Sequence, residues 1–163
     1  MLFEKKVKMV GECGIDSIKT KIDINLQTQV FERQICLAEK YQIPLLVHCV
    51  GEMNALISLR KKHNTNFWIY HGFHGSEVEA KKLLEMNIYT SFGSALLNKK
   101  NMKITKSLAF SFAHENLLLE TDNDETHSCE ISEIYTEAAR RLGVDVIKVI
   151  EIVLKSLKRL NVL

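Results

Sequence analysis

Hydrophobic residues are concentrated in short segments of the chain, and four of these segments end at a histidine or a carboxylate. Runs that are aromatic, β-branched or rich in leucine predict buried strands at 7–12, 44–47, 67–70, 88–92 and 117–121. Helical periodicity fills the intervals between them. Strands that alternate with helices are typical of a parallel sheet with right-handed crossovers. The pattern therefore predicts an α/β fold with five strands and flanking helices.

Capping residues give the expected ends of the helices. Helices are predicted at 52–62, 77–86, 102–113 and 130–142, with a first helix capped by Asn25 and a last helix capped by Asp145. Ser76 and Glu79 have the spacing of a capping box at the start of the helix predicted at 77–86. Gly143 is placed to end the helix before it.

The same periodicity predicts which side chains are buried. The buried face of the first helix is expected to contain Leu26, Val30, Leu37, Ala38 and Tyr41. The basic cluster Arg60-Lys61-Lys62-His63 is expected to form a solvated helix face, with His63 on the surface. Cys13 alternates to the opposite face of its strand from Glu12, so we expect it to pack in the core.

Length and composition add few constraints. The 163 residues suit one domain, 1–163, with 46% hydrophobic and 26% charged residues. A net charge of +2 gives no strong electrostatic argument for nucleic acid binding. The longest apolar runs are far shorter than the roughly 20 residues of a membrane helix. Four cysteines without a CxxC pair favour a reducing, cytoplasmic setting.

The side chains at the strand ends carry the candidate chemistry. Glu12, His48, His71 and Asp122 follow four of the predicted strands, and in a parallel sheet such ends lie on one face. A single residue of this kind is more often a surface or core residue, whereas four together favour a metal site. This set without thiolates suits one or two divalent ions such as zinc, manganese or magnesium. Asp122 is the candidate to hold the attacking water and take its proton, which indicates metal-assisted hydrolysis.

The motifs around these residues resemble the TatD family of metal-dependent hydrolases. The matching segments are Gly11–Asp16, Val47–Cys49, His71–Ser76, Tyr89–Phe92 and Leu118–Asp122. The resemblance implies a TIM barrel with a two-metal site and deoxyribonuclease activity. It also implies that Glu12 bridges the metals, that His48 and His71 hold one of them, and that Asp122 belongs to the other.

The chain departs from the family pattern at its beginning. Family members begin with a strand that carries a His-x-His pair, and no such pair precedes Glu12. A full barrel has eight strands, so the resemblance implies an incomplete, N-terminally shortened TIM-barrel-type sheet. The strands at 7–11 and 117–121 would then be sheet edges, and exposed edges favour pairing into a homo-oligomer.

Three interpretations of function follow from the sequence. The first is a TatD-like hydrolase that cleaves DNA phosphodiester bonds, with DNA as its partner and no membrane association. The second is a TatD-like remnant without catalysis. The third is a metal-dependent hydrolase of a small amide or ester, because the same ligands serve both chemistries. No residue is assigned to substrate binding.

Overall fold

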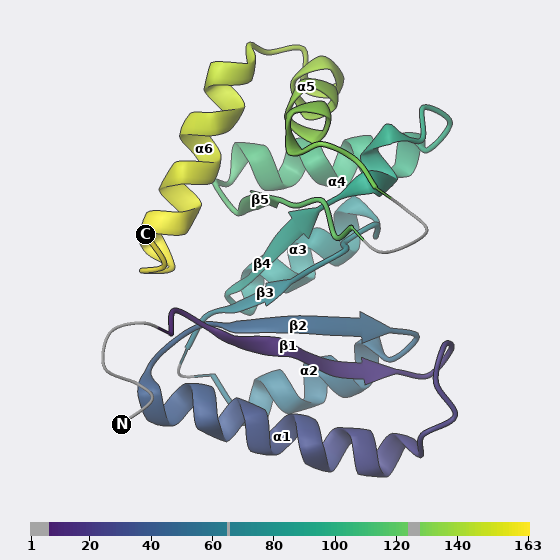
Figure 1. Ribbon diagram of the computed structural model, residues 1–163, viewed down its shortest axis with the longest axis vertical. Helices are drawn as coiled ribbons and strands as arrows, with labels where there is room; N and C mark the ends of the chain where they lie inside the picture. Colours follow the sequence, from purple (N-terminus) through teal and green to yellow (C-terminus); the bar gives the residue numbers. More distant parts are fainter. Residues whose placement is uncertain (1–6, 65, 124–127) are drawn as a thin grey trace. The chain divides into compact units, whose positions relative to one another are not determined.

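The computed structural model describes residues 7–64, 66–123 and 128–163. The chain forms two compact units, of which the first runs to Tyr70 and the second from His71 to Asn161. The last two residues are divided between them. Figure 1 shows the elements of both units. Among the described residues, no helix is long and apolar enough to cross a membrane.

The first unit is a parallel sheet covered by helices. Its elements are the strands β1 (Val10–Asp16), β2 (Leu45–Val50) and β3 (Trp68–Tyr70) and the helices α1 (Ile24–Tyr41) and α2 (Met53–Lys62). The strand β2 pairs in parallel with β1 and with β3. Both helices lie on the same face of these strands (Figure 1). Because a helix covers that face, alternate residues of β2 are buried there.

The core of the first unit is centred on α1 and β3. Phe31, Ile35 and Ala38 of α1 are buried, and the ring of Phe31 meets the edge of Trp68 at a centroid distance of 5.8 Å. The expected buried face of this helix was wrong at all but one position. Four of its members, Leu26, Val30, Leu37 and Tyr41, are exposed, and only Ala38 is buried.

The start of α1 also differs from the prediction. Asp23, not Asn25, is the N-cap, because its carboxylate accepts hydrogen bonds from the backbone N–H groups of Asn25 and Leu26. The buried side chains then follow at positions i, i+4 and i+7 through Phe31. Several apolar residues lie outside this stripe, so apolar periodicity alone selected the wrong face.

The predicted solvated face at the end of α2 was wrong for two residues. The side chain of Arg60 is only 2% exposed, and its guanidinium lies 5.1 Å from the centre of the Trp68 ring. Burial lowers the pKa of Arg60 to about 10, although the negative charge of Glu39 acts to raise it. His63 is also largely covered, between Glu32 and Glu39. A guanidinium can be buried when it stacks on an aromatic ring, which charge patterning does not reveal.

In the described residues of the second unit, two strands are combined with four helices. Its elements are β4 (Ile88–Phe92), β5 (Leu117–Leu119), the helices α3 (Glu77–Glu85), α4 (Met102–Ala113), α5 (Ile131–Leu142) and α6 (Val146–Arg159), and the 3-10 turn η1 (Ser94–Leu97). The strands β4 and β5 are parallel. Phe73 and Phe92 pack edge to face at 5.4 Å in the core.

The predicted caps of the second unit are confirmed. Ser76 and Glu79 form a capping box at the start of α3. Gly143 ends α5 in the left-handed conformation, and Asp145 caps α6 by accepting a hydrogen bond from the backbone N–H of Ile147. These signals were reliable because each is a local contact within a few residues.

The first two strands end later than the sequence predicted, and β1 also begins later, at Val10 rather than at residue 7. β1 continues to Asp16 and β2 to Val50, so Glu12 and His48 lie within strands. Pairing persists because Gly14 lies opposite His48. A Cβ at Gly14, which has a φ of 155°, would lie 1.8 Å from the carbonyl oxygen of His48. The close approach of β1 to β2 therefore requires glycine at this position.

We expect Gly14→Ala to lower the free energy of unfolding by about 1–3 kcal/mol more than Gly143→Ala does, because the added carbon forces the strands apart. Gly143 has a left-handed φ of 67° and nothing within 4 Å of an added Cβ, so its substitution brings only backbone strain. Urea unfolding of both variants measures the difference. Equal losses would show that Gly14 does not limit the approach of β1 to β2.

Candidate metal-binding site

The first unit brings Glu12 and His48 together. Glu12 lies on β1 and His48 on β2, and Oε1 of Glu12 is 2.9 Å from Nδ1 of His48. Both side chains lie on the face opposite the buried Cys13 and Val47. Strand alternation therefore keeps these two polar groups away from the helix-covered core and next to each other.

Asp16 holds the other side of the His48 ring. Oδ2 of Asp16 lies 3.2 Å from Nε2 of His48, and Oδ1 accepts hydrogen bonds of 2.8 Å from the backbone N–H groups of Ile18 and Lys19. The N–H of Lys19, then that of Ile18 and the contact with His48, lower the pKa of Asp16 against the opposing effect of burial. An ionised Asp16 favours the tautomer in which Nε2 carries the proton, so that Nδ1 can bind an ion beside Glu12.

The second unit brings His71 close to two carboxylates. Nδ1 of His71 is 3.4 Å from Oε1 of Glu120 and 3.9 Å from Oδ2 of Asp122. One ligand atom from each of these residues lies within 4.8 Å of the other two. The side chain of Asp122 is 61% exposed, so its carboxylate is accessible to solvent and to a substrate.

Glu120 connects three segments of the second unit. Its Oε1 accepts a hydrogen bond of 2.6 Å from the backbone N–H of Gly72, and its Oε2 accepts one from the hydroxyl of Ser91. The loop that follows His71, the end of β4 and the end of β5 are thus tied to one carboxylate. This arrangement explains why β4 can carry the polar Ser91 next to its end although all its residues are buried.

The structure therefore assembles the predicted residues as two pairs, Glu12 with His48 in the first unit and His71 with Asp122 in the second. Sequence reasoning missed Asp16 and Glu120, which contact the histidines. The sequence spacing could have pointed to both, since Asp16 follows Glu12 by four residues and Glu120 precedes Asp122 by two. Asp16 lies on the same face of β1 as Glu12 because strand faces repeat every second residue.

The residues present fit a divalent metal ion. Carboxylate oxygens and imidazole nitrogens are ligands of zinc, manganese and magnesium, each to a different degree. The neighbouring thiols are poor ligands for this site, because they keep their protons. Burial is the main cause that raises the pKa of Cys13 to about 12 and that of Cys49 to about 11. The prediction that Cys13 is a core residue is confirmed.

Parallel strands that alternate with helices and present histidines and carboxylates define an α/β fold of the TIM-barrel type with a candidate metal site. Residues 1–161 match the model of the family described as TatD related DNase. The chain therefore belongs to the TatD family, which confirms the resemblance seen in the motifs.

Curated relatives carry names consistent with this family. An uncharacterized metal-dependent hydrolase, YabD of Bacillus subtilis, is 32% identical over 120 residues, which cover 72% of this chain and 47% of the relative. A 3'-5' ssDNA/RNA exonuclease TatD of Klebsiella pneumoniae is 26% identical over 121 residues, which cover 73% of this chain and 46% of the relative. The chain spans about half the length of the curated relatives it matches.

Solved structures confirm the predicted fold class. The crystal structure of the TatD homologue YjjV from Escherichia coli matches 94% of this chain and 63% of its own, with a TM-score of 0.83 and 20% sequence identity. A TatD family hydrolase from Entamoeba histolytica matches 95% of this chain and 63% of its own, with a TM-score of 0.81 and 18% identity. At this identity the likeness shows the fold alone.

We expect Glu120→Ala to lower the free energy of unfolding by about 1–3 kcal/mol, because the Gly72 N–H and the Ser91 hydroxyl lose their acceptor. Glu85→Ala is the matched control, since it removes an exposed carboxylate of the same unit and should change stability by less than about 0.5 kcal/mol. Thermal or urea unfolding compares the two. A loss for Glu120→Ala no larger than the control's would contradict the structural role of this carboxylate.

Proposed function

We propose that this chain is a metal-dependent hydrolase that cleaves DNA phosphodiester bonds. The observation that carries the proposal is the Glu12–His48 pair, held by Asp16 on adjacent parallel strands in a chain whose residues 1–161 match the TatD related DNase family. A pair of ligands with a supporting carboxylate is the arrangement expected of a metal centre and is unusual for a purely structural sheet surface.

The proposed ligand roles are those that the TatD resemblance implies. Glu12 and His48 would hold one ion, to which the resemblance adds His71, and Asp122 would belong to a second. A bound divalent ion supplies Lewis-acid stabilisation and lowers the pKa of a nearby water to about 7. Asp16 fixes the ring of His48, and Glu120 fixes the loop that carries His71.

Asp122 is the proposed general base. Its carboxylate is exposed beside His71, where it can orient a water molecule for attack on a phosphorus atom and accept the proton that the water loses. The new bond forms between the water oxygen and phosphorus, and the bond from phosphorus to the ester oxygen breaks. The products are a phosphate monoester and a free hydroxyl on the departing nucleotide chain.

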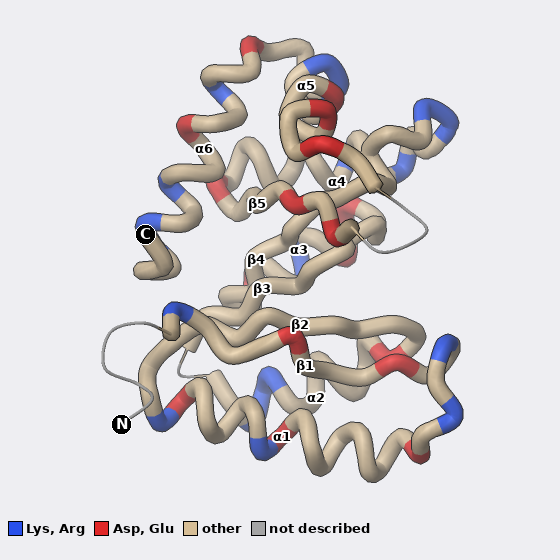
Figure 2. The backbone as a smooth tube through the Cα atoms, in the orientation of Figure 1, with Lys and Arg blue, Asp and Glu red and all other residues tan. Residues whose placement is uncertain are grey.

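The choice of DNA as substrate is supported by relatives and by local charge. The match from Schizosaccharomyces pombe is named Deoxyribonuclease Tat-D and is 27% identical over 122 residues. Figure 2 shows basic residues at the start of α4, where Lys99, Lys100, Lys103 and Lys106 are located. Such side chains can contact phosphates without reading sequence. Lys103 also approaches Glu79 at 3.6 Å, which reduces the charge it offers.

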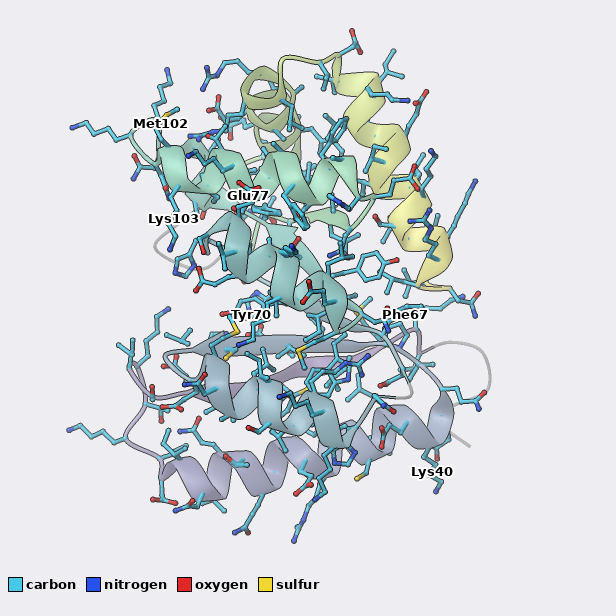
Figure 3. The ribbon with its side chains drawn as sticks, turned by 180° about the vertical axis from the view of Figure 1, so that it is seen from behind. Lys40, Phe67, Tyr70, Glu77, Met102 and Lys103 are labelled. Carbon is cyan, nitrogen blue, oxygen red and sulfur yellow. The ribbon has the colours of Figure 1, made fainter. Side chains whose placement is uncertain are left out.

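A hollow beside these lysines widens this surface. It has a volume of about 450 Å³ and is lined by side chains of α3 and α4, among them Val78, Met102, Lys103 and Lys106. Met102 and Lys103 project from the start of α4 and Glu77 lies on α3 (Figure 3).

The expected self-association through sheet edges stays a prediction.

We expect His48→Ala to lower the amount of retained divalent metal at least about tenfold, because it removes a ligand. His114→Ala is the matched control, since His114 is an exposed histidine at the end of α4, with Nδ1 2.8 Å from the backbone oxygen of Phe110, and is not among the proposed ligands. Elemental analysis after dialysis measures the metal per chain. Equal retention by His48→Ala and His114→Ala would contradict the assignment.

We expect Asp122→Asn to reduce metal-dependent release of nucleotides from single-stranded DNA by about 10²- to 10⁴-fold, because the amide cannot accept the proton. Asp23→Asn is the control, since asparagine is an equally good N-cap for α1. The assay is run with metal, with chelator, and after metal is returned. If no metal ion supports hydrolysis, the result would favour the remnant without catalysis. Cleavage of an amide or ester but not of DNA would favour the small-molecule hydrolase.

A further inference from the structure

We propose that the first unit contains a separate metal-binding site, formed by Cys36, Glu39 and His63 and suited to a zinc-type ion. One ligand atom from each of these side chains lies within 4.8 Å of the other two. The three donors are a thiol, a carboxylate and an imidazole, and they come from two different helices. None of them belongs to the pairs that carry the proposed hydrolase activity.

The sequence places two of the donors, Cys36 and Glu39, and a second carboxylate on one face of α1. Glu32, Cys36 and Glu39 are separated by four and three residues, so their side chains lie along one line of the helix. His63 is the C-cap residue of α2 and has an extended backbone, with its N–H bonded to the carbonyl of Leu59. The face of α1 therefore meets a histidine fixed at the end of α2.

Several contacts hold His63 in this position. The guanidinium of the buried Arg60 donates a hydrogen bond of 2.9 Å to the carbonyl oxygen of His63. Nδ1 of His63 lies 2.9 Å from Oε2 of Glu39, and Nε2 lies 3.1 Å from Oε1 of Glu32. One ring nitrogen can bind an ion while the other donates to the remaining carboxylate, which is the usual support of a metal-binding histidine.

The distances are compatible with a tetrahedral ion. Zinc binds sulfur at about 2.3 Å and nitrogen or oxygen at about 2.0–2.2 Å, which places neighbouring ligand atoms about 3.5 Å apart. Side-chain rotations therefore suffice to bring the three atoms from within 4.8 Å into contact with one ion. A water molecule can complete the fourth position.

The thiol of Cys36 is reachable from solvent. Cys36 is exposed, unlike the buried Cys13 and Cys49, and it lines a surface hollow of about 390 Å³ with Gln29, Glu32 and Arg33. Sulfur makes this donor set softer than the oxygen and nitrogen set of Glu12 and His48, so it selects zinc or cobalt over magnesium.

Lys62 is the competing cation at this site. Its Nζ lies 2.5 Å from Oε1 of Glu32, and its side chain is 67% exposed. The ammonium group can therefore swing away when an ion enters. Because Lys62 neutralises a carboxylate that would favour the ion, Lys62→Ala should strengthen metal binding, whereas a role limited to holding the two helices together predicts no such gain.

The test is a titration of the purified protein with Co²⁺, followed by the absorption band that a thiolate gives when it binds cobalt. This band reports only sulfur ligation, so it does not depend on the Glu12–His48 pair. We expect the band in the wild type and in His48→Ala, its loss in Cys36→Ser, and at least tenfold weaker binding in His63→Gln. Excess Zn²⁺ should displace the cobalt and abolish the band.

The matched control is Cys129→Ser, which removes the other cysteine that is not buried and should leave the band unchanged. Cys36 is exposed, so Cys36→Ser keeps the fold, and circular dichroism checks this. The absence of a band in the wild type, its persistence in Cys36→Ser, or its loss in Cys129→Ser would each overturn the proposal. A protein that shows the band but has no nuclease activity would count against the proposed function and not against this metal site.

Discussion

The parallel pairing of β1 with β2 is the constraint on which the candidate chemistry of the first unit depends. Gly14 lies opposite His48, and the strands approach so closely there that a Cβ would meet the carbonyl oxygen of His48. This register keeps Cys13 and Val47 in the core and leaves Glu12 and His48 on the other face. A slip by one residue would reverse both faces, so packing of the core and placement of the polar pair are fixed together.

A carboxylate behind each candidate histidine is the second common feature. Asp16 contacts His48, Glu120 contacts His71, and Glu32 contacts His63. Two of these carboxylates are themselves held by backbone N–H groups, those of Ile18 and Lys19 for Asp16 and that of Gly72 for Glu120. The orientation of the imidazoles is therefore set by main-chain geometry, which is more rigid than contacts between side chains alone.

The sequence predicted the five strands and the caps at Ser76, Gly143 and Asp145 because each depends on a local pattern. The stripe through Phe31 and the burial of Arg60 against Trp68 were missed, because they depend on which elements meet in space. Asp16 and Glu120 were missed for a related reason. Asp16 shares a strand face with Glu12 and Glu120 directly follows β5, but the role of each appears only when the hydrogen bonds to His48, Gly72 and Ser91 are known.

Donor chemistry separates the two candidate metal sites of the first unit. At Glu12 and His48 the nearby thiols are buried and hold their protons, since burial raises the pKa of Cys13 to about 12 and that of Cys49 to about 11. At Cys36 the thiol is exposed beside an imidazole and a carboxylate. Solvent access to sulfur thus distinguishes a site for harder ions, suited to hydrolysis, from a softer site for zinc. An ion at the second site would link α1 to the end of α2, and thereby stabilise the helices that cover the strands carrying Glu12 and His48.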